Sequence, residues 1–364
     1  MKYKFLAAAL AASLLLPAAA VSAQPGGKPQ LEVAAESDEM IWNAVAVHRD
    51  RVFVAGPRWT GSKGPALALL DNDGKPKAYP DAAWNAWHPG ADAAGAFVNI
   101  NAIHLDRDSL WVVDTGAPDF GGDPLPGGAK LVHIDLVRNQ VVKRYFFGPE
   151  IAPPGSYVDD VRFRGDIAYL TDAGRPGLIV LDLENGMARR VLEGHPSTVA
   201  STARPIVLDG NIVKAPDGSP LMVNSDPLDL SPDGKWLYFG PLSGPWSRIE
   251  TRWLDDAGLS AEELAAKVEP WTNLPPVGGT VVDANGDFYF TDLAENALKR
   301  RAPDGEITTV IRDQRLHWVD APFIEEERTI WLPVPQMDRV ALFNGGTAKT
   351  RWPVQLFRLE LEKK

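Results

Sequence analysis

One pattern of hydrophobic and polar positions recurs along the chain six times. In each copy an apolar segment ends in a turn built from Asp, Asn or Gly, and a short segment rich in aromatic residues follows. Such turns supply the positive backbone angles that β-hairpins require, so each copy predicts two antiparallel strands. The six copies begin near Trp42, Asn99, Tyr157, Asp226, Gly278 and Val319.

Further strand candidates lie between the copies, such as Leu131 to Leu136, Gly177 to Leu183 and Glu306 to Arg312. Their apolar and β-branched content fits outer strands. A four-stranded antiparallel sheet repeated six times around an axis accounts for this spacing. The sequence therefore predicts an all-β protein, a single six-bladed β-propeller over residues 41–364 around a central channel. The alternating segment Val354 to Glu362 is expected to complete the first blade, with the sixth blade as the alternative.

One segment departs from the strand pattern. Leu259 to Glu269 predicts a short helix, in which Ser260 and Glu263 form a capping box and Pro270 ends the helix. We expect an insertion between the fourth and fifth blades, and the alternative is a lid over the channel.

The N-terminal segment has the order of a secretory signal peptide. Lys2 and Lys4 precede an apolar run from Phe5 to Leu16, and small residues lead to Ala23. We expect cleavage after residue 23, with residues 24–40 as a mobile lead-in and the mature protein secreted or periplasmic and free of the membrane. A retained anchor is the alternative, but the apolar run is shorter than the roughly 20 residues that span a bilayer.

Charge and composition exclude several function classes. The formal net charge is −11 at pH 7 and no block of Lys and Arg is present, so nucleic acid is not an expected partner. The chain has no Cys, which excludes disulfides, thiolate metal ligands and a Cys nucleophile. It also lacks a G-x-S-x-G serine motif and a phosphate-binding P-loop.

Three blocks resemble successive segments of the major royal jelly protein and yellow family. They are SLWVVDTG (109–116), IAYLTDAGRPGLIVLDLENG (167–186) and DLSPDGKWLYFGPLSG (229–244). Regucalcin and gluconolactonase-type propellers are the nearest alternative. The resemblance implies the propeller fold and export. Within the family, the chain resembles a bacterial, L-dopachrome tautomerase-related member. Because family members are associated with dopachrome conversion, amine binding or storage, the resemblance leaves the activity open. The chain departs from insect members because it has no Cys.

The aligned copies place polar side chains at one position of each first strand. Because the innermost strands of a propeller begin at one end of the channel, we expect these residues to converge there. They are Asn43, Asn101, Asp159, Asp226, Gly278 and Asp320. If the strand register is shifted, the near neighbours Asp160 and Asp229 would take the place of Asp159 and Asp226. Their oxygens suit a polar ligand or a hard cation such as Ca²⁺, with Asn101, Asp159 and Asp226 as metal ligands. The alternative is that they only hydrogen-bond the turn backbone.

Two further residue types are candidates for the site. His317, beside Trp318 and near Asp320, is a candidate acid or base, and the alternative is a packed loop residue. His104 is expected to be a packed sheet residue. Trp318 is expected in a loop of an aromatic ligand box with Trp84, Trp87, Trp246 and Trp271, whereas Trp111, Trp236 and Trp331 should fill wedges between blades.

Three function classes remain. The first is an exported binding protein that holds a small cationic or aromatic ligand at the channel mouth, with or without a divalent cation. The second is an enzyme: a tautomerase for a quinone-like substrate, or a metal-dependent lactonase in which Asp226 acts as base. The third is a scaffold that binds another exported protein. The sequence leaves open whether the chain is an enzyme.

Overall fold

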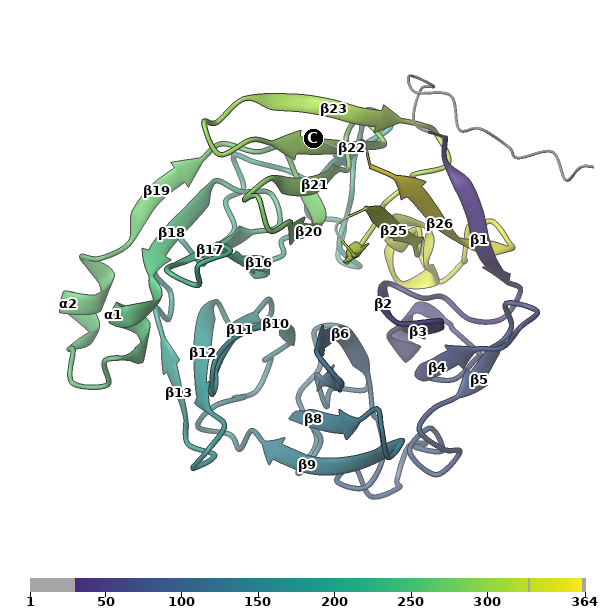
Figure 1. Ribbon diagram of the computed structural model, residues 1–364, viewed down its shortest axis with the longest axis horizontal. Helices are drawn as coiled ribbons and strands as arrows, with labels where there is room; N and C mark the ends of the chain where they lie inside the picture. The colour runs from purple at the N-terminus through teal and green to yellow at the C-terminus, as the bar shows by residue number, and fades with distance from the viewer. Residues whose placement is uncertain (1–29, 327, 362–364) are drawn as a thin grey trace, which may run out of the picture.

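The chain forms six four-stranded antiparallel sheets arranged as blades around a central axis (Figure 1). The computed structural model describes residues 30–326 and 328–361. The predicted all-β, six-bladed propeller is confirmed. The predicted signal peptide lies outside the described residues. In the described part, no helix has the length and apolarity needed to cross a membrane.

Five blades follow the chain from the axis outward. Blade 1 contains β2 (Ala44–His48), β3 (Arg51–Ala55), β4 (Leu67–Leu70) and β5 (Pro76–Ala78). Blade 2 contains β6 (Ile100–Asp106), β7 (Ser109–Asp114), β8 (Lys130–Asp135) and β9 (Gln140–Phe146). Blade 3 contains β10 (Val158–Arg164), β11 (Ile167–Asp172), β12 (Gly177–Asp182) and β13 (Ala188–Val191).

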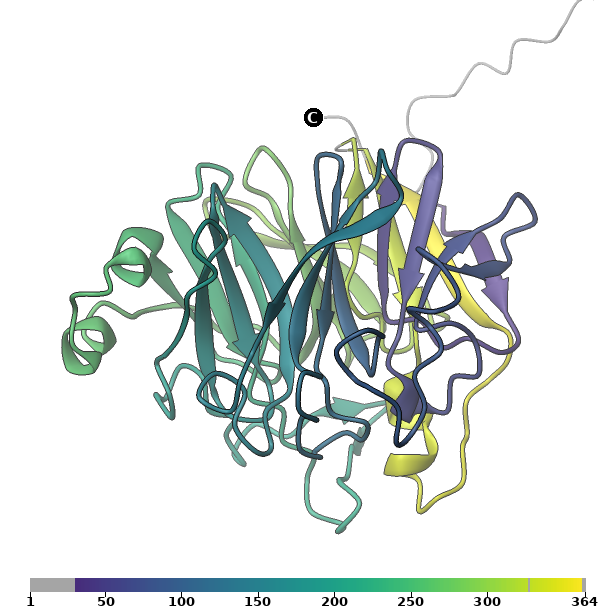
Figure 2. The ribbon, with the colours of Figure 1, turned by 90° about the horizontal axis from the view of Figure 1, so that it is seen from below.

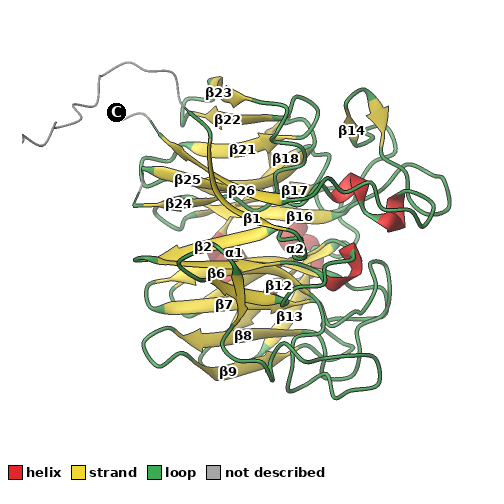
Figure 3. Ribbon diagram, turned by 90° about the vertical axis from the view of Figure 1, so that its right-hand side faces the viewer, coloured by secondary structure: helices red, strands yellow, loops and turns green. Residues whose placement is uncertain are grey.

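The next two blades repeat this order. Blade 4 contains β16 (Ser225–Leu230), β17 (Trp236–Pro241), β18 (Trp246–Glu250) and β19 (Glu269–Thr272). Blade 5 contains β20 (Val277–Val282), β21 (Phe288–Asp292), β22 (Ala297–Arg301) and β23 (Ile307–Arg312). A hairpin of β14 (Val207–Leu208) and β15 (Asn211–Ile212) lies in the connection between blades 3 and 4, and β14 projects beyond the blade ends (Figure 3).

The sixth blade combines both ends of the described chain. It contains β24 (Phe323–Glu325), β25 (Thr329–Val334), β26 (Val354–Glu360) and, outermost, β1 (Glu32–Ser37). The expectation that the C-terminal strand joins the first blade is wrong, because β26 pairs with β25. Within the expected lead-in of residues 24–40, residues 32–37 are the strand that closes the ring, and residues up to 29 lie outside the described range.

The predicted helix forms within the expected residues, but it lies inside a blade rather than between two blades. Ser260 caps α2 (Ala261–Ala265), and its capping box with Glu263 is complete. Together with α1 (Thr251–Asp255), α2 lies between β18 and β19, inside blade 4 and at its outer rim (Figures 1 and 2). The helix is therefore neither an insertion between blades nor a lid over the channel. Single-turn 3₁₀ helices in the described residues are η1 (Arg58–Thr60), η2 (Met337–Arg339) and η3 (Ala341–Phe343).

Apolar side chains between neighbouring blades form the core. Trp111 of blade 2 packs on Phe163 of blade 3 with ring centroids 4.7 Å apart, and Trp331 is buried beside β2, as expected for wedge residues. Trp236 differs, because it is half-buried beneath the Arg248 guanidinium, 4.1 Å from its ring centroid. Trp246 and Trp271 belong to β18 and β19 rather than to loops, so they do not join Trp318 in an aromatic box.

Candidate functional site

Local irregularities of the innermost strands aim the predicted polar residues at the channel mouth. The pairing register of β6, β10, β16 and β20 shifts at Asn101, Asp159, Asp226 and Gly278, respectively. A β-bulge of this kind redirects a side chain out of the regular alternation. Asp320 precedes β24 and is held by its backbone N–H, which donates to the Pro333 carbonyl oxygen (3.2 Å).

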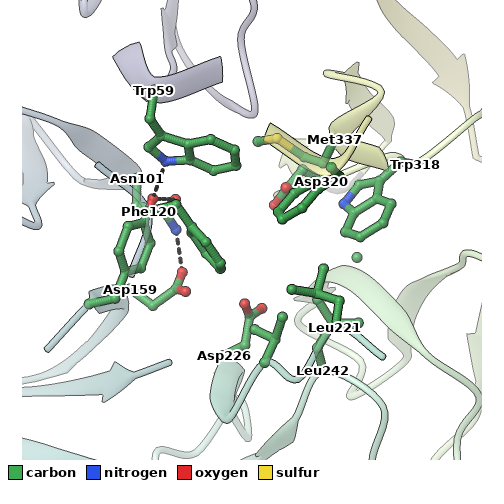
Figure 4. Close-up of a pocket in the computed structure, with 14 residues that line it drawn as sticks. Trp59, Asn101, Phe120, Asp159, Leu221, Asp226, Leu242, Trp318, Asp320 and Met337 are labelled. Carbon is green, nitrogen blue, oxygen red and sulfur yellow. Dashed lines mark hydrogen bonds between the residues drawn. The ribbon is translucent and has the colours of Figure 1, made fainter. Parts of the chain in front are cut away.

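Five of the six aligned positions line one cavity. The polar positions, here called its acidic floor, and the mostly aromatic and apolar side chains of its walls surround one space (Figure 4). The lining residues are Trp59, Asn101, Phe120, Tyr157, Asp159, Leu221, Val223, Asp226, Leu242, Gly278, Trp318, Asp320, Met337 and Phe343. Asn43 does not line the cavity, and its side-chain amide supports Asn101 from behind by donating to the Asn101 carbonyl oxygen (2.8 Å).

Three carboxyl groups converge in this cavity and raise one another's pKa. Burial raises the pKa of Asp159 well above its usual value, and the charge of Asp226 adds to the shift. Burial also raises the pKa of Asp226 and of Asp320, with each carboxylate's charge disfavouring ionisation of the next. Figure 4 shows the Asp159 and Asp226 carboxyl groups turned toward each other, and burial together with the neighbouring negative charge favours the protonated form of such groups.

Within the part of the chain that the structure describes, these three carboxyl groups have no cationic partner. Among the described residues, no Lys, Arg or His forms an ion pair with Asp159, Asp226 or Asp320. The neighbouring carboxylates differ, because Arg162 holds both Asp160 (Nη1 to Oδ2, 2.8 Å) and Asp229 (Nε to Oδ1, 3.0 Å) in another cavity. The carboxylates beside Arg162 are thus paired with a positive charge, whereas the three carboxyl groups at the channel mouth are not.

A chain of hydrogen bonds runs from the aromatic wall to the acidic floor. Trp59 Nε1 donates to the Tyr157 hydroxyl (2.9 Å), which donates to Asn101 Oδ1 (3.0 Å). The Asn101 side-chain amide in turn donates to Asp159 Oδ1. Burial, with the Asp159 charge adding to it, raises the pKa of Tyr157 well above its usual value, so the phenol keeps its proton. The chain fixes the direction of the Asn101 amide.

Three aromatic rings from separate loops cover the cavity. Trp59 and Phe120 have centroids 5.0 Å apart, and Phe343 lies 5.9 Å from Trp59 and 5.7 Å from Phe120. The cavity volume of about 50 Å³ beneath them holds a few water molecules. An ammonium group fits this space, whereas a larger ligand requires the rings to separate.

The model of the family described as major royal jelly protein matches residues 101–359. The chain belongs to this family. Solved propellers with similar folds include virginiamycin B lyase from Staphylococcus aureus, at 13% identity and a TM-score of 0.52, covering 92% of this chain and 100% of that one. A gluconolactonase from Xanthomonas campestris has 11% identity and a TM-score of 0.52, covering 92% and 95%. These likenesses show the fold alone. No curated protein sequence matches the chain.

In this member of the major royal jelly family, His317 does not line the acidic cavity. Its Nε2 lies 2.8 Å from Asp338 Oδ1 and its Nδ1 lies 3.5 Å from Asp209 Oδ2, so the expected partnership with Asp320 is replaced. Trp318, the next residue, does line the cavity. His104 is buried in the sheet, where burial and then the Arg162 charge lower its pKa to about 3.

Of the three predicted metal ligands in this royal jelly family member, Asp159 and Asp226 face each other and Asn101 donates a hydrogen bond to Asp159. Among the described residues, no three His, Cys, Asp or Glu side chains gather closely enough to hold an ion. Asn101 turns its amide nitrogen toward Asp159 and its oxygen toward Tyr157, so it presents no free oxygen beside the carboxyl pair. Ca²⁺ binding therefore stays a prediction.

Sequence reasoning missed the cover and the hydrogen-bond chain of this family member. Trp59, Phe120 and Phe343 lie in or beside loops that share no repeated spacing, so alignment of the six copies carries no signal for them. Tyr157 directly precedes β10 in the third copy, and its position two residues before Asp159 is the one signal that was available.

Proposed function

We propose that the protein binds a small organic cation with an aromatic part, such as an arylethylamine, at the channel mouth. One observation carries the proposal: Asp159, Asp226 and Asp320 converge in a cavity with aromatic walls, and no described cationic side chain pairs with them. Burying carboxylates without a partner is costly, and a bound cation removes that cost.

The cavity walls supply the second half of the recognition. Aromatic faces attract cations, and this attraction strengthens where water is excluded. In the proposed complex the ammonium group lies at the carboxyl groups, and the ligand ring takes a place among Trp59, Phe120 and Phe343. These rings touch one another only through edges and tilted faces, so a planar ring can enter between them.

Matched ligands test the proposal. Tryptamine should raise the melting temperature by roughly 5 °C at a hundredfold excess over its Kd, whereas tryptophol, which carries a neutral hydroxyl on the same skeleton, and indole-3-acetate should not. An equal response to tryptophol would reduce the proposal to aromatic binding. A response to Ca²⁺ that a chelator reverses, without a response to tryptamine, would replace it with a metal site.

A variant pair assigns the binding to the carboxyl groups. Asp320→Asn should weaken tryptamine binding by about tenfold or more, because it removes one charge from the mouth. Asp50→Asn on the exposed turn between β2 and β3 removes the same charge elsewhere and should leave binding unchanged. Equal effects of the two substitutions would show that only the overall charge of the protein attracts the amine.

A second candidate function rests on the facing carboxyl groups of Asp159 and Asp226, whose pKa values are both raised by burial. Two carboxyl groups that share one proton can take a proton at one atom of a substrate and return one at another, which is the chemistry of a tautomerase. One carboxyl group of the pair, in its protonated form, would donate a proton while the other accepts one. Loss of turnover of a quinone-like substrate in Asp226→Asn, with substrate binding retained, would support this function over binding alone.

The remaining predictions stay proposals with their own tests. We propose export, which predicts that the mature chain begins at Gln24 when its N-terminus is sequenced. The lactonase alternative requires a bound divalent ion and predicts lactone hydrolysis that a chelator abolishes. The scaffold alternative predicts a stable complex with another exported protein.

A further inference from the structure

A second cleft lies beside the acidic cavity, on the other side of a thin wall. It has a volume of about 420 Å³, within the size range of small-molecule sites. The hairpin β14–β15 forms one side, and residues 338–351 form the other. Phe343 lines both spaces, and consecutive residues face opposite ways: Trp318 and Met337 line the acidic cavity, whereas His317 and Asp338 line the cleft.

The cleft has the opposite charge from its neighbour. Four cationic side chains line it: Lys214, Arg339, Lys349 and Arg351. None of them forms an ion pair with another residue of the described chain. Burial lowers the pKa of Arg339, and the Arg351 charge adds to this shift while Asp338 and Asp209 oppose it. Arg339 thus keeps its charge in a partly desolvated place, where an external anion is favourable.

Two carboxylates in the cleft compete for these cations, and His317 engages both. Its Nε2 lies 2.8 Å from Asp338 Oδ1 and its Nδ1 lies 3.5 Å from Asp209 Oδ2. Asn296 also donates to Asp209 Oδ1 (3.1 Å). The Arg339 Nη1 group donates instead to the Gln336 side-chain oxygen (2.8 Å). With the two carboxylates directed toward His317, the guanidinium and ammonium groups are left for a ligand.

We infer that this cleft is a binding site for a small oxyanion, a carboxylate or a phosphate, with Arg339 as its main contact and His317 as a positioning residue. The planar guanidinium matches the geometry of both oxyanions, and lysines add charge. In a chain of net charge −11, an anion approaches only where positive charge is concentrated. The site is independent of the proposed function, since it uses none of the three carboxyl groups of the channel mouth.

Calorimetric titration with inorganic phosphate and with succinate, at low ionic strength, tests the site. We expect at least one anion to bind below about 10 mM, and the stronger of the two identifies the oxyanion class. The affinity for the anion should fall as the NaCl concentration rises, because the pairing is electrostatic.

Variants assign the binding to particular side chains. Arg339→Gln should weaken anion binding about tenfold or more, and Lys349→Gln, on an exposed loop, should weaken it less. Arg138→Gln removes one charge from an exposed turn of blade 2 and should bind as wild type.

A double substitution tests the role of His317. His317→Gln should weaken anion binding several-fold, because it frees Asp338 to pair with Arg339. Adding Asp338→Asn should restore the affinity, which a merely structural role of His317 would not predict. The inference is overturned if neither anion binds wild-type protein at about 10 mM, or if Arg339→Gln and Lys349→Gln both bind like wild type. The positioning role of His317 is overturned if the variant with both His317→Gln and Asp338→Asn binds the anion as weakly as His317→Gln alone.

Discussion

Asp226 has opposite effects on stability and on ligand binding. Its pKa is raised in the folded protein by burial and by the Asp320 charge. A raised folded pKa means that the folded state binds the proton more tightly than the unfolded state. This contribution to stability is therefore complete below the unfolded pKa and is lost as the pH rises through the folded pKa.

Asp226→Asn should consequently stabilise the free protein at neutral and alkaline pH, because the amide carries no charge to bury. We expect a gain of about 1–3 kcal/mol at pH 8 and little change at pH 4, measured by urea unfolding at both pH values. The same variant should lose tryptamine binding. A loss of stability at pH 8 would mean that the Asp226 charge is compensated in the folded protein.

The Tyr157 hydroxyl links the aromatic cover to the acidic floor. Tyr157→Phe leaves Trp59 Nε1 without its acceptor and leaves Asn101 Oδ1 with only the long hydrogen bond from the Asn43 side-chain amide (3.5 Å). We expect a cost of about 1–3 kcal/mol in unfolding free energy and weaker amine binding, because Asn101 loses its fixed direction. Trp84→Phe, at a half-buried ring outside the cavity, is the control for binding. Unchanged amine affinity in Tyr157→Phe would exclude the hydrogen-bond chain from recognition.

At the scale of the strand, an Asp that ends the second strand of a blade recurs together with a buried or partly buried cationic side chain. Asp114 ends β7 and accepts from Lys130 Nζ (2.7 Å), and both side chains are fully buried. Asp172 ends β11 and pairs with Arg190 Nη1 (2.8 Å), and Asp292 ends β21 and pairs with Lys299 Nζ (2.6 Å). The repeated Asp at the strand end could be recognised in the sequence. Its cationic partner could not, because the partner lies at a different sequence spacing in each blade.

Removing one member of such a pair should be severe. Lys130→Met leaves the Asp114 carboxylate buried without its partner and should cost about 3–5 kcal/mol, measured by chemical denaturation. Adding Asp114→Asn should recover part of the loss, since the unpaired charge is then gone. A loss below about 1 kcal/mol in Lys130→Met would show that water reaches Asp114.

At the scale of the molecule, the ring closes through β1. This strand pairs with β26 from Glu32 opposite Arg358 to Ser37 opposite Val354. Ala35→Pro removes a backbone donor at a buried position of β1 and should lower the unfolding free energy by about 3 kcal/mol or more, exposing the edge of β26. Ala348→Pro in an exposed loop is the control. Equal stability of the two variants would show that the ring holds without β1.

The repeat explains which features the sequence could predict. Six similar copies establish the blade number. Their alignment locates Asn101, Asp159 and Asp226, where bulges recur at one position of the inner strands, and Asp320, which precedes the inner-strand segment of the sixth blade. Features that occur once were missed: the closing strand β1 lies in a polar N-terminal segment, and the cover comes from loops of unequal length. The expected nearness of His317 to Asp320 did not follow from the sequence, because consecutive residues such as His317 and Trp318 line different cavities.

The most direct test of the account is calorimetric titration of the wild-type protein with tryptamine near neutral pH, in two buffers of different ionisation enthalpy. A bound cation favours the ionised form of the three carboxyl groups, whose pKa values are raised in the free protein. The account predicts binding with net release of protons, and an affinity that increases with pH. Absence of binding, or binding without proton release and equalled by tryptophol, would contradict it.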